Sequence, residues 1–425
     1  MLQLKKINPI VIGVGGSSGK TTTANLIYLI LSKKYKTKQG EGKNSETGIP
    51  LNILGISVNN YSFIFWLKVL FLAPYKLFTN NHKYDFYVVE IGIDSPFFPK
   101  NMDYLLSIVS PKIGVLTNID IEHSEAFDQL VDEQDEDKRK EEILRIIAKE
   151  EGLLLKSIPE SGKSVVNIDN LSIRNLLPLK SSALTISAKD KSSDLYISKI
   201  SVSIDNFELS FVFLNENYSL KINQPLPKYF AYSFALSIAA CFSCGISIKD
   251  CLSYISENFS LPPGRFSVFK GIKKTLVIDS SYNSSLEATI GAIEAVAAVA
   301  ENRRKVGILG DMRELGTLSK IQHELLAKII VKNLDSVVLI GPLMKKYVAP
   351  ILDKNKFSYI SFEGFSEAKK EILEMMREND IILVKGSQNT LFLERAVEML
   401  LENKDDSKKL CRRGEFWDRK RKESS

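Results

Sequence analysis

The sequence predicts an α/β protein of two domains, each built on a largely parallel sheet. The first observation is a glycine-rich segment, residues 13–19, that stands between an apolar run and a helix-forming run. The second is the alternation of short apolar runs, typical of buried parallel strands, with longer helical patterns. The third is a Pro-Pro-Gly turn at 262–264, after which this alternation starts again. The predicted parts are a central phosphate-loop domain (1–262), a Rossmann-like C-terminal domain (263–402) and a charged, disordered tail (403–425).

Residues 13–23 have the layout of a phosphate-binding loop, in which a strand leads into glycines, a Lys-Thr pair and a helix. Glycines let the backbone N–H groups point at phosphate oxygens, and the helix N-terminus adds partial positive charge. Lys20 is expected to neutralise phosphate, and the Thr21 hydroxyl to ligate Mg²⁺. The alternative, a plain glycine turn, requires neither Lys20 nor Thr21. Val14 departs from the strict phosphate-loop pattern, which has glycine at this position. The predicted binding residues for ATP or GTP are Gly16, Ser17, Ser18, Gly19, Lys20, Thr21 and Thr22.

The composition is that of a globular protein without a polyanion-binding surface. The chain has a net charge of +6, but residues 404–425 carry nine Lys/Arg and five Asp/Glu, so the rest is near +2. Nucleic acid is therefore not expected as a partner. Cys241-x-x-Cys244 lacks the second pair of a zinc ribbon, and its thiols are expected to pack as small hydrophobes. With no signal peptide before the first strand, a cytoplasmic location is expected.

The longest apolar segment, residues 63–73, admits two interpretations. Lys68 interrupts it and Pro74 ends it, well short of the roughly 20 residues that a membrane span needs. The first interpretation is a buried helix. The alternative is a helix that lies on a membrane surface or on a partner, which leaves a weak membrane contact open.

Acidic side chains follow two predicted core strands. Residues 85–92 form a strand that contains Glu90 near its end, and the strand at 113–119 leads to Glu122 and His123. Acids at the carboxyl ends of strands in open α/β sheets are well placed to hold Mg²⁺ beside a phosphate loop. His123 is one of three histidines in the chain and a candidate ligand, although a solvated loop histidine is the alternative.

The remaining segments complete the two domains. The polar loop at 41–50 is either part of the site or a connector, the charged stretch at 125–151 is helical, and alternation at 183–223 predicts a few antiparallel strands. In the second domain, strands are predicted over 275–279, 306–312, 336–341 and 381–387, with helices between them.

Nine collinear segments between about residues 9 and 400 resemble the Mur ligases, the ATP-dependent ligases of peptidoglycan synthesis. The likeness is greatest to the members that add D-alanyl-D-alanine to a muramoyl-tripeptide. The segments are Gly16-x-x-Gly19-Lys20-Thr21-Thr22, residues 44–50, Glu90-Ile91-Gly92, Thr117-Asn118-Ile119-x-x-Glu122-His123, Asn167-x-Asp169-Asn170, Gly264-Arg265, Asp279-x-x-Tyr282-Asn283, Leu309-Gly310-Asp311-Met312-x-Glu314-Leu315-Gly316 and Val384-Lys385-Gly386-Ser387.

The resemblance implies a reaction and a set of site residues. ATP would phosphorylate an acceptor carboxylate, and the amine of an amino acid or dipeptide would attack the acyl-phosphate, so the partners are small peptidoglycan precursors. A second Mg²⁺ would lie on Glu90 and His123, beside a carbamylated lysine for which Lys138 is favoured and Lys140 is the fallback. The residues implied to bind nucleotide are Asn283 (adenine), Asp279 (ribose) and Arg265, and those implied to bind substrate are Asn44, Ser45, Glu46, Thr47, Lys385 and Ser387.

Several departures put the acceptor in doubt. The family usually has a further N-terminal domain that binds the uridine nucleotide, and the residues before Gly13 are too few to form it. The uridine part is therefore expected to be held elsewhere, or the acceptor is not a UDP-sugar. Ser280, Ser285 and Gln388 stand where Asp, Asn and Arg are common in the family, and a Pro-rich segment at 94–99 replaces a glycine turn.

Other functions stay open from the sequence. One is the ligase subunit that amidates a precursor with ammonia from a glutaminase partner, although its usual four-cysteine zinc ribbon is absent from this sequence. Another is a nucleotide-binding scaffold without catalysis, against which the intact Lys20, Thr21, Glu90 and His123 argue. Ligation of the polyglutamate or folate type is a further alternative.

Overall fold

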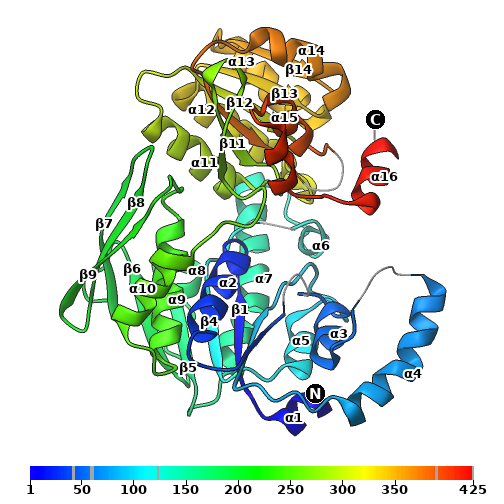
Figure 1. The fold of residues 1–425 in the computed structure, drawn as a ribbon, viewed down its shortest axis with the longest axis vertical. Helices are drawn as coiled ribbons and strands as arrows, with labels where there is room; N and C mark the ends of the chain where they lie inside the picture. Colours follow the sequence, from blue (N-terminus) through cyan, green and yellow to red (C-terminus); the bar gives the residue numbers. More distant parts are fainter. Residues whose placement is uncertain (41–43, 58–61, 122–123, 388–390, 424–425) are drawn as a thin grey trace. The chain divides into compact units, whose positions relative to one another are not determined.

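The computed structural model describes residues 1–40, 44–57, 62–121, 124–387 and 391–423, and it consists of two compact units (Figure 1). The first unit comprises Met1–Ile200, Leu209–Leu220 and Phe230–Phe259. The second comprises Ser201–Glu208, Lys221–Tyr229 and Ser260–Ser425. The last change of unit therefore falls between residues 259 and 260, close to the predicted boundary at 262.

A nine-stranded sheet carries the first unit. Its order is β2-β3-β1-β4-β5-β6-β7-β8-β9, and pairing is parallel from β2 through β7. Short turns join β7, β8 and β9, as antiparallel neighbours allow. The strands are β1 (Ile10–Gly15), β2 (Thr37–Gln39), β3 (Phe86–Glu90), β4 (Ile113–Leu116), β5 (Lys163–Asn167), β6 (Ser182–Ser187), β7 (Leu195–Val202), β8 (Phe207–Phe213) and β9 (Glu216–Ile222). The antiparallel part predicted for 183–223 is thus confined to β7–β9, because β6 pairs in parallel with both of its neighbours.

Helices cover the sheet in two sets. α2 packs against α9 and α10, while α7 packs against α5, β1 and β4. Cys241 and Cys251 are free, buried thiols of α9 and α10, and Cys241 Sγ lies 3.8 Å from the carbonyl oxygen of Ile27 in α2. The helices of this unit are α1 (Leu2–Ile7), α2 (Lys20–Leu31), α3 (Gly48–Leu54), α4 (Phe63–Thr79), α5 (Met102–Ile108), α6 (Glu125–Asp128), α7 (Glu136–Ser157), α8 (Leu171–Arg174), α9 (Phe230–Phe242) and α10 (Ile248–Asn258).

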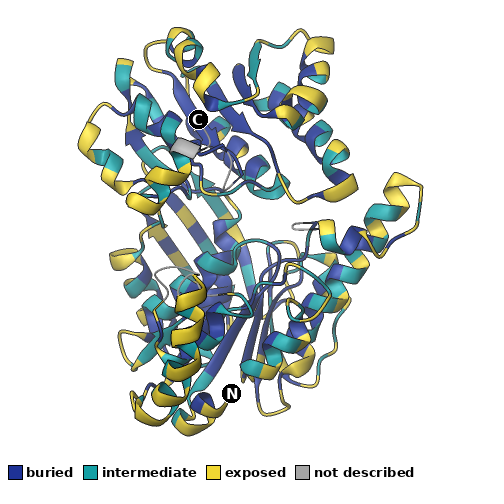
Figure 2. Ribbon diagram, turned by 90° about the vertical axis from the view of Figure 1, so that its right-hand side faces the viewer, coloured by how far each residue is buried: buried dark blue, intermediate teal, exposed yellow. Residues whose placement is uncertain are grey.

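A six-stranded sheet carries the second unit, in the order β10-β11-β15-β12-β13-β14. β10 is antiparallel to β11, and the other pairs are parallel. Figure 2 shows the strands largely in the colour of buried residues, as expected for a sheet with apolar clusters on both faces. The strands are β10 (Ser267–Lys270), β11 (Leu276–Ser280), β12 (Lys305–Gly310), β13 (Ser336–Ile340), β14 (Tyr359–Phe362) and β15 (Ile381–Lys385). The two-domain α/β prediction is confirmed.

The helices of the second unit divide between the two apolar clusters. α11 and α12 contribute to one cluster, and α14 and α15 to the other. The helical segments are η1 (Ile272–Lys274), α11 (Leu286–Val299), η2 (Gly316–Leu318), α12 (Ser319–Asn333), η3 (Met344–Val348), α13 (Ala349–Lys354), α14 (Phe365–Met375), α15 (Glu394–Leu400), η4 (Lys404–Lys409) and α16 (Glu415–Glu423).

The segment at 63–73 differs from its first interpretation as a buried helix. It forms most of α4, which continues through Pro74 to Thr79 and contains no buried residue. Phe63, Phe71 and Phe78 are each exposed by more than three quarters of their surface. The buried-helix prediction is therefore wrong, because apolar composition was taken as a sign of burial. No helix in the described ranges has both the length and the apolarity to cross a membrane.

The tail also differs from the expectation of disorder over 403–425. Residues 404–409 form η4 and 415–423 form α16, while Leu410, Cys411 and Arg412 between them are buried. Arg412 Nη1 lies 2.8 Å from Glu394 Oε2, and neither side chain is more than 3% exposed. The basic composition of the tail misled the prediction, because one of its charges has a buried partner.

This ion pair gives a stability prediction. Arg412→Met should lower the free energy of unfolding of the second unit by about 3–5 kcal/mol, because it removes the shorter of the two ion pairs that Glu394 makes with described residues and leaves the contact of 3.5 Å to Arg421. Urea denaturation followed by circular dichroism would measure the change. The matched control is Arg419→Met, at an exposed position of α16, which should change stability by less than about 0.5 kcal/mol. Equal effects of the two substitutions would contradict a stabilising role for the buried pair.

Candidate active site

The phosphate loop joins β1 to α2 and depends on close backbone packing. Gly16 and Gly19 have φ values of +117° and +78°, in the region that favours glycine. A Cβ on Gly16 would lie 2.3 Å from Thr117 Oγ1 and 2.7 Å from the carbonyl oxygen of Asn118. Any larger residue at position 16 would thus push the loop away from the residues that follow β4.

Thr117 and Asn118, directly after β4, hold the loop in place. Asn118 accepts from Ser17 N through its carbonyl oxygen (2.9 Å) and from Ser18 N through Oδ1 (2.7 Å). Thr117 Oγ1 donates to the carbonyl oxygen of Ser18 (2.6 Å). Both residues lie in one of the segments that carry the family resemblance, but no role was predicted for either.

Glu151 is a further residue of the loop's surroundings, and no role was predicted for it. The residue is 3% exposed, and its Oε2 accepts from Gly16 N at 2.9 Å. It lies on the buried side of α7 with Ile143 and Ile147, at four-residue spacing. An acid on an otherwise apolar helical stripe was the signal in the sequence, because a buried carboxylate requires a partner.

The predicted phosphate ligands are thus partly engaged within the protein. The N–H groups of Gly16, Ser17 and Ser18 donate to Glu151 and Asn118. Lys20 Nζ donates to the carbonyl oxygens of Gly16 (2.6 Å) and Ser17 (2.8 Å). Binding of phosphate by these groups would require the present bonds to be exchanged, and their role remains a prediction.

Thr21 and Glu90, two of the three predicted magnesium ligands, are in contact. Thr21 Oγ1 donates to Glu90 Oε2 at 2.9 Å, because Glu90 ends β3 opposite Val14 of β1. A hydroxyl and a carboxylate are hard oxygen donors of the kind that Mg²⁺ binds, so each residue suits the ion that it was predicted to hold. His123 lies outside the described residues, and the described ranges contain no group of three His, Cys, Asp or Glu that could hold a metal.

The candidate lysines lie at the start of α7. Lys138 is exposed in the first turn, where its N–H is capped by Asp135 Oδ1 at 3.0 Å. Lys140 is partly buried. The choice between them as a carbamylated residue remains a prediction.

The predicted substrate-binding residues 44–47 lie between the end of β3 and the start of α3. Gly92 N donates to the carbonyl oxygen of Asn44 at 3.4 Å, which places Asn44 near the end of β3. Ser45 Oγ accepts from Gly48 N (3.2 Å) and lies 3.4 Å from Thr47 Oγ1, at the start of α3. Glu46 is half-buried. The loop therefore has a structural role, and its binding role remains a prediction.

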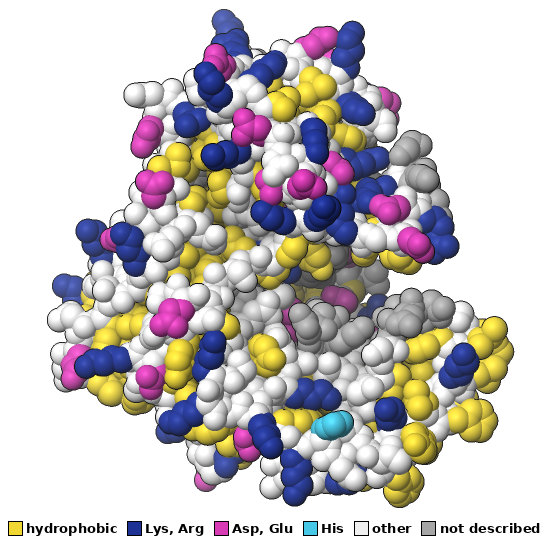
Figure 3. Space-filling model, viewed as in Figure 1, with side chains coloured by type: hydrophobic (Ala, Val, Ile, Leu, Met, Phe, Trp, Pro, Cys, Tyr) yellow, Lys and Arg dark blue, Asp and Glu magenta, His cyan; other side chains and the backbone are white. Residues whose placement is uncertain are grey.

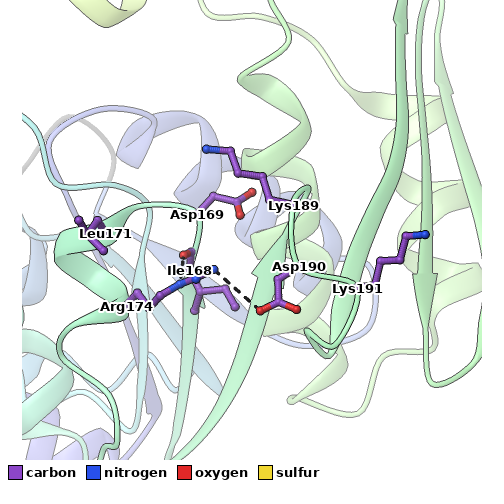
Figure 4. Close-up of a pocket in the computed structure, with 7 residues that line it drawn as sticks. All are labelled: Ile168, Asp169, Leu171, Arg174, Lys189, Asp190 and Lys191. Carbon is purple, nitrogen blue, oxygen red and sulfur yellow. Dashed lines mark hydrogen bonds and ion pairs between the residues drawn. The ribbon is translucent and has the colours of Figure 1, made fainter.

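A polar pocket adjoins β5 and the Asn167–Asn170 segment (Figure 4). Asp169 accepts from Ser187 Oγ, from Ala188 N (2.6 Å) and from the Tyr232 hydroxyl (2.6 Å). Burial alone would raise the pKa of Asp169, but these hydrogen bonds outweigh it and lower that pKa, so the carboxylate stays charged. The pocket is lined by Ile168, Asp169, Leu171, Arg174, Lys189, Asp190 and Lys191.

In the second unit, three predicted site residues gather around the turn after β11. Lys385 Nζ, at the end of the neighbouring β15, donates to the carbonyl oxygen of Asn283 (2.9 Å) and contacts Ser280 Oγ (3.4 Å). The Arg265 guanidinium lies 4.7 Å from the centre of the Tyr282 ring. Carboxyl ends of parallel strands meet at one edge of a sheet, and ligands of α/β proteins commonly bind there.

Asp279 lies in the same region but points into the fold. It is fully buried, and Oδ1 accepts from Ser281 N (3.0 Å) and Ser281 Oγ (2.6 Å). Burial raises the pKa of its carboxyl, although the bonds from Ser281 and the nearby Arg412 act in the opposite direction. The carboxylate thus shapes the turn, and the contact with ribose implied by the resemblance would require it to move.

Ser387 supports the adjacent turn after β12. Its hydroxyl accepts from Arg313 N (3.1 Å), and its own N–H donates to the carbonyl oxygen of Asp311 (3.2 Å). His323 Nε2 accepts from Met312 N at 3.2 Å, which leaves Nδ1–H to donate to the carbonyl oxygen of Ser319 at 2.6 Å. The predicted contact of Ser387 with an amine substrate remains a prediction.

These features define the class as a nucleotide-binding α/β protein, since a strand, a glycine loop with Lys-Thr and a helix stand beside a strand-terminal acid. Comparison with known families is consistent with this class. Residues 14–241 match the Mur ligase middle domain, and residues 264–388 match the Mur ligase, glutamate ligase domain. The chain belongs to the Mur ligase family, whose members are ATP-dependent C–N ligases. The resemblance inferred from the motifs is confirmed.

Individual relatives match along most of the chain. UDP-N-acetylmuramoyl-tripeptide–D-alanyl-D-alanine ligase of Borreliella burgdorferi is 24% identical over 89% of this chain and 72% of the relative. The Bacillus subtilis ligase of the same name is also 24% identical, over 94% and 78%. The structure of Thermotoga maritima MurF ligase in complex with ADP superposes with a TM-score of 0.72 at 23% identity, covering 93% of this chain and 80% of that one. MurF from Acinetobacter baumannii superposes with a TM-score of 0.75 at 19% identity, covering 95% and 78%.

The buried His323 predicts a pH dependence of stability. Burial lowers the pKa of its imidazole from the ordinary 6.5, although the bond to Ser319 opposes this. The stability that this neutral group confers is therefore present above pH 6.5 and is lost as the pH falls through the lower pKa of the folded state. The urea midpoint of the wild type should accordingly fall more between pH 7.5 and 5 than that of His323→Leu, whose midpoint at pH 7.5 should already be lower. Parallel declines in the two proteins would contradict this account.

Proposed function

We propose that the protein is an ATP-dependent ligase that adds D-alanyl-D-alanine to a muramoyl-tripeptide in peptidoglycan synthesis. The observation that carries the proposal is the group of Lys20, Thr21 and Glu90 at the carboxyl ends of β1 and β3, where a phosphoryl donor could meet a carboxylate acceptor. The name of the ligases from B. burgdorferi and B. subtilis, which match 89–94% of the chain, supports the choice of substrates.

The reaction would proceed in two displacements. An acceptor carboxylate oxygen attacks the γ-phosphorus of ATP, and ADP leaves. The amine of the dipeptide then attacks the acyl carbon, the C–O bond to phosphate breaks, and the nitrogen loses a proton as the amide forms. The products are the extended peptide, ADP and phosphate. Such a reaction demands mainly positioning and neutralisation of charge from the protein.

Residues of the first unit would meet the phosphates. Lys20 would release the carbonyl oxygens of Gly16 and Ser17 and donate to phosphate oxygens instead. Thr21 would hold one Mg²⁺, and Glu90 with His123 would hold a second; when bound, these ions neutralise phosphate charge. Asn118 and Glu151 would position the loop without touching substrate, through Ser18 and Gly16.

Residues of the second unit would bind the rest of the nucleotide and the amine. Asn283 and Arg265 are proposed as nucleotide contacts, because both are partly exposed, Asn283 in the turn after β11 and Arg265 against the Tyr282 ring of that turn. Lys385 and Ser387 are proposed to bind the incoming dipeptide. Lys385 already donates to the carbonyl oxygen of Asn283, so the two proposed groups are linked by a hydrogen bond.

ADP release by the purified protein tests the proposal. Release should require both UDP-muramoyl-tripeptide and D-Ala-D-Ala, and Lys20→Ala should lower kcat/KM by about 100-fold or more. Lys33→Ala, at the exposed end of the turn after α2, is the matched control and should leave turnover intact. Stimulation by lipid-linked precursor and ammonia instead would overturn the choice of substrates. Full turnover of Lys20→Ala would remove the loop from the mechanism.

The contact between Thr21 and Glu90 gives a separate prediction. Thr21→Val keeps the shape of the side chain but removes the hydroxyl, so the Mg²⁺ concentration for half-maximal ADP release should rise by about tenfold or more. Thr21→Ser retains the hydroxyl and should stay close to the wild type. If the valine and serine variants have the same Mg²⁺ requirement, Thr21 is not a ligand.

A further inference from the structure

Helix α4 presents an apolar surface outside the predicted active site. Figure 3 shows hydrophobic side chains gathered over the part of the surface that α4 occupies in Figure 1. The exposed fractions are 77% for Phe63, 65% for Ile64, 43% for Leu67, 67% for Leu70, 80% for Phe71, 61% for Tyr75 and 78% for Phe78. So many large apolar side chains in one exposed helix indicate an interaction surface.

The exposed side chains follow the periodicity of a helix. Phe63, Leu67, Leu70, Phe71 and Phe78 recur at the three- and four-residue spacing of one helical face. The partly buried side chains occupy the opposite face, at Phe65, Val69, Leu72, Ala73, Lys76 and Leu77. The helix therefore rests on the first unit by one face and leaves the more apolar face uncovered.

Several contacts hold α4 to the body of the first unit. Gln3 Nε2 of α1 donates to the carbonyl oxygen of Asn80 at 2.7 Å, and Asn80 Nδ2 donates to the carbonyl oxygen of Leu54 at 3.2 Å. Lys6 Nζ donates to the carbonyl oxygens of Leu77 (3.2 Å) and Phe78 (3.1 Å). These bonds hold the C-terminal end of α4 against α1 and the end of α3, and so fix the orientation of its apolar face relative to the first unit.

The segment that contains α4 carries charges of one sign. Residues 47–84 contain Lys68, Lys76 and Lys83 and no Asp or Glu, and Lys5 and Lys6 lie on the adjoining α1. Lysines at the border of an apolar helical face can place their stems along it and their ammonium groups in anionic headgroups. Aromatic side chains such as Trp66 and Tyr75 favour the same interfacial depth. A binding partner that matches this surface would combine an apolar layer, for the exposed apolar side chains, with anionic groups beside it, for the lysines.

We propose that α4 binds the surface of an anionic lipid bilayer, with its axis in the plane of the headgroups. At 17 residues, with Lys68 and Pro74 inside it, the helix suits this position and does not suit a span. The binding is independent of ligase chemistry, because α4 carries none of the residues proposed for the reaction. It would bring the soluble reaction close to a membrane surface.

Vesicle flotation with the full chain tests the proposal. The protein should float with phosphatidylcholine vesicles that contain phosphatidylglycerol, and less with phosphatidylcholine alone or at high salt. Leu70→Asp with Phe71→Asp should lower the bound fraction by roughly tenfold or more while ADP release stays intact. The control is Leu214→Asp, which places one such charge at an exposed leucine in the turn after β8. Lys68→Glu should reduce binding to anionic vesicles more than Lys199→Glu, at an exposed position of β7.

A spectroscopic measurement provides an independent readout. The chain has two tryptophans, so Trp417→Phe leaves Trp66 of α4 as the single one. Its emission should shift to shorter wavelength when anionic vesicles are added, and the Leu70→Asp, Phe71→Asp variant should lack this shift. Equal binding of the wild type and this double variant would overturn the proposal. A wild type that stays with the aqueous fraction would also overturn it; if that protein forms a dimer lost in the double variant, the surface belongs to a second copy, and if it is monomeric, to a protein partner.

Discussion

The close approach of Gly16 to the residues that follow β4 is the constraint on which the rest of the first unit depends. Because β1 and β4 are neighbours, the loop after β1 passes directly over Thr117 and Asn118. Asn118 then accepts from the loop, and Glu151 accepts from it on the side of α7. The position of Lys20, and of the first turn of α2, follows from this packing.

The predicted site residues have the same kind of position in both units. In each, the polar side chains follow strands whose carboxyl ends share an edge: β1, β3 and β4 in the first unit, and β11, β15 and β12 in the second. Apolar cores hold these strands, so the side chains at their ends are set by rigid elements. The loops need only short hydrogen bonds, such as that from Lys385 to Asn283, to complete each arrangement.

The sequence predicted well those features that depend on local order. The sequence of strand, glycine loop and helix at residues 10–31, Glu90 at the end of its strand and the alternation of strands and helices are all encoded within short segments. Features that depend on distant partners were missed or mistaken. The charge of Arg412 has its partner in Glu394, Glu151 accepts from a loop 135 residues away, and the more apolar face of α4 is not covered by any part of the chain that the structure describes. Composition alone does not show whether an apolar side chain is buried or exposed in the folded protein, or whether a charged one has a buried partner.

The internal hydrogen bonds of the phosphate loop affect how it distinguishes anions. Because Lys20 and three loop amides already have protein acceptors, an incoming ion gains only the difference between new bonds and old ones. A small monoanion could replace few of these acceptors, whereas a triphosphate can reach many at once. If the loop binds nucleotide as proposed, it would be selective through the number of simultaneous contacts, and common cellular anions would compete with the nucleotide only weakly.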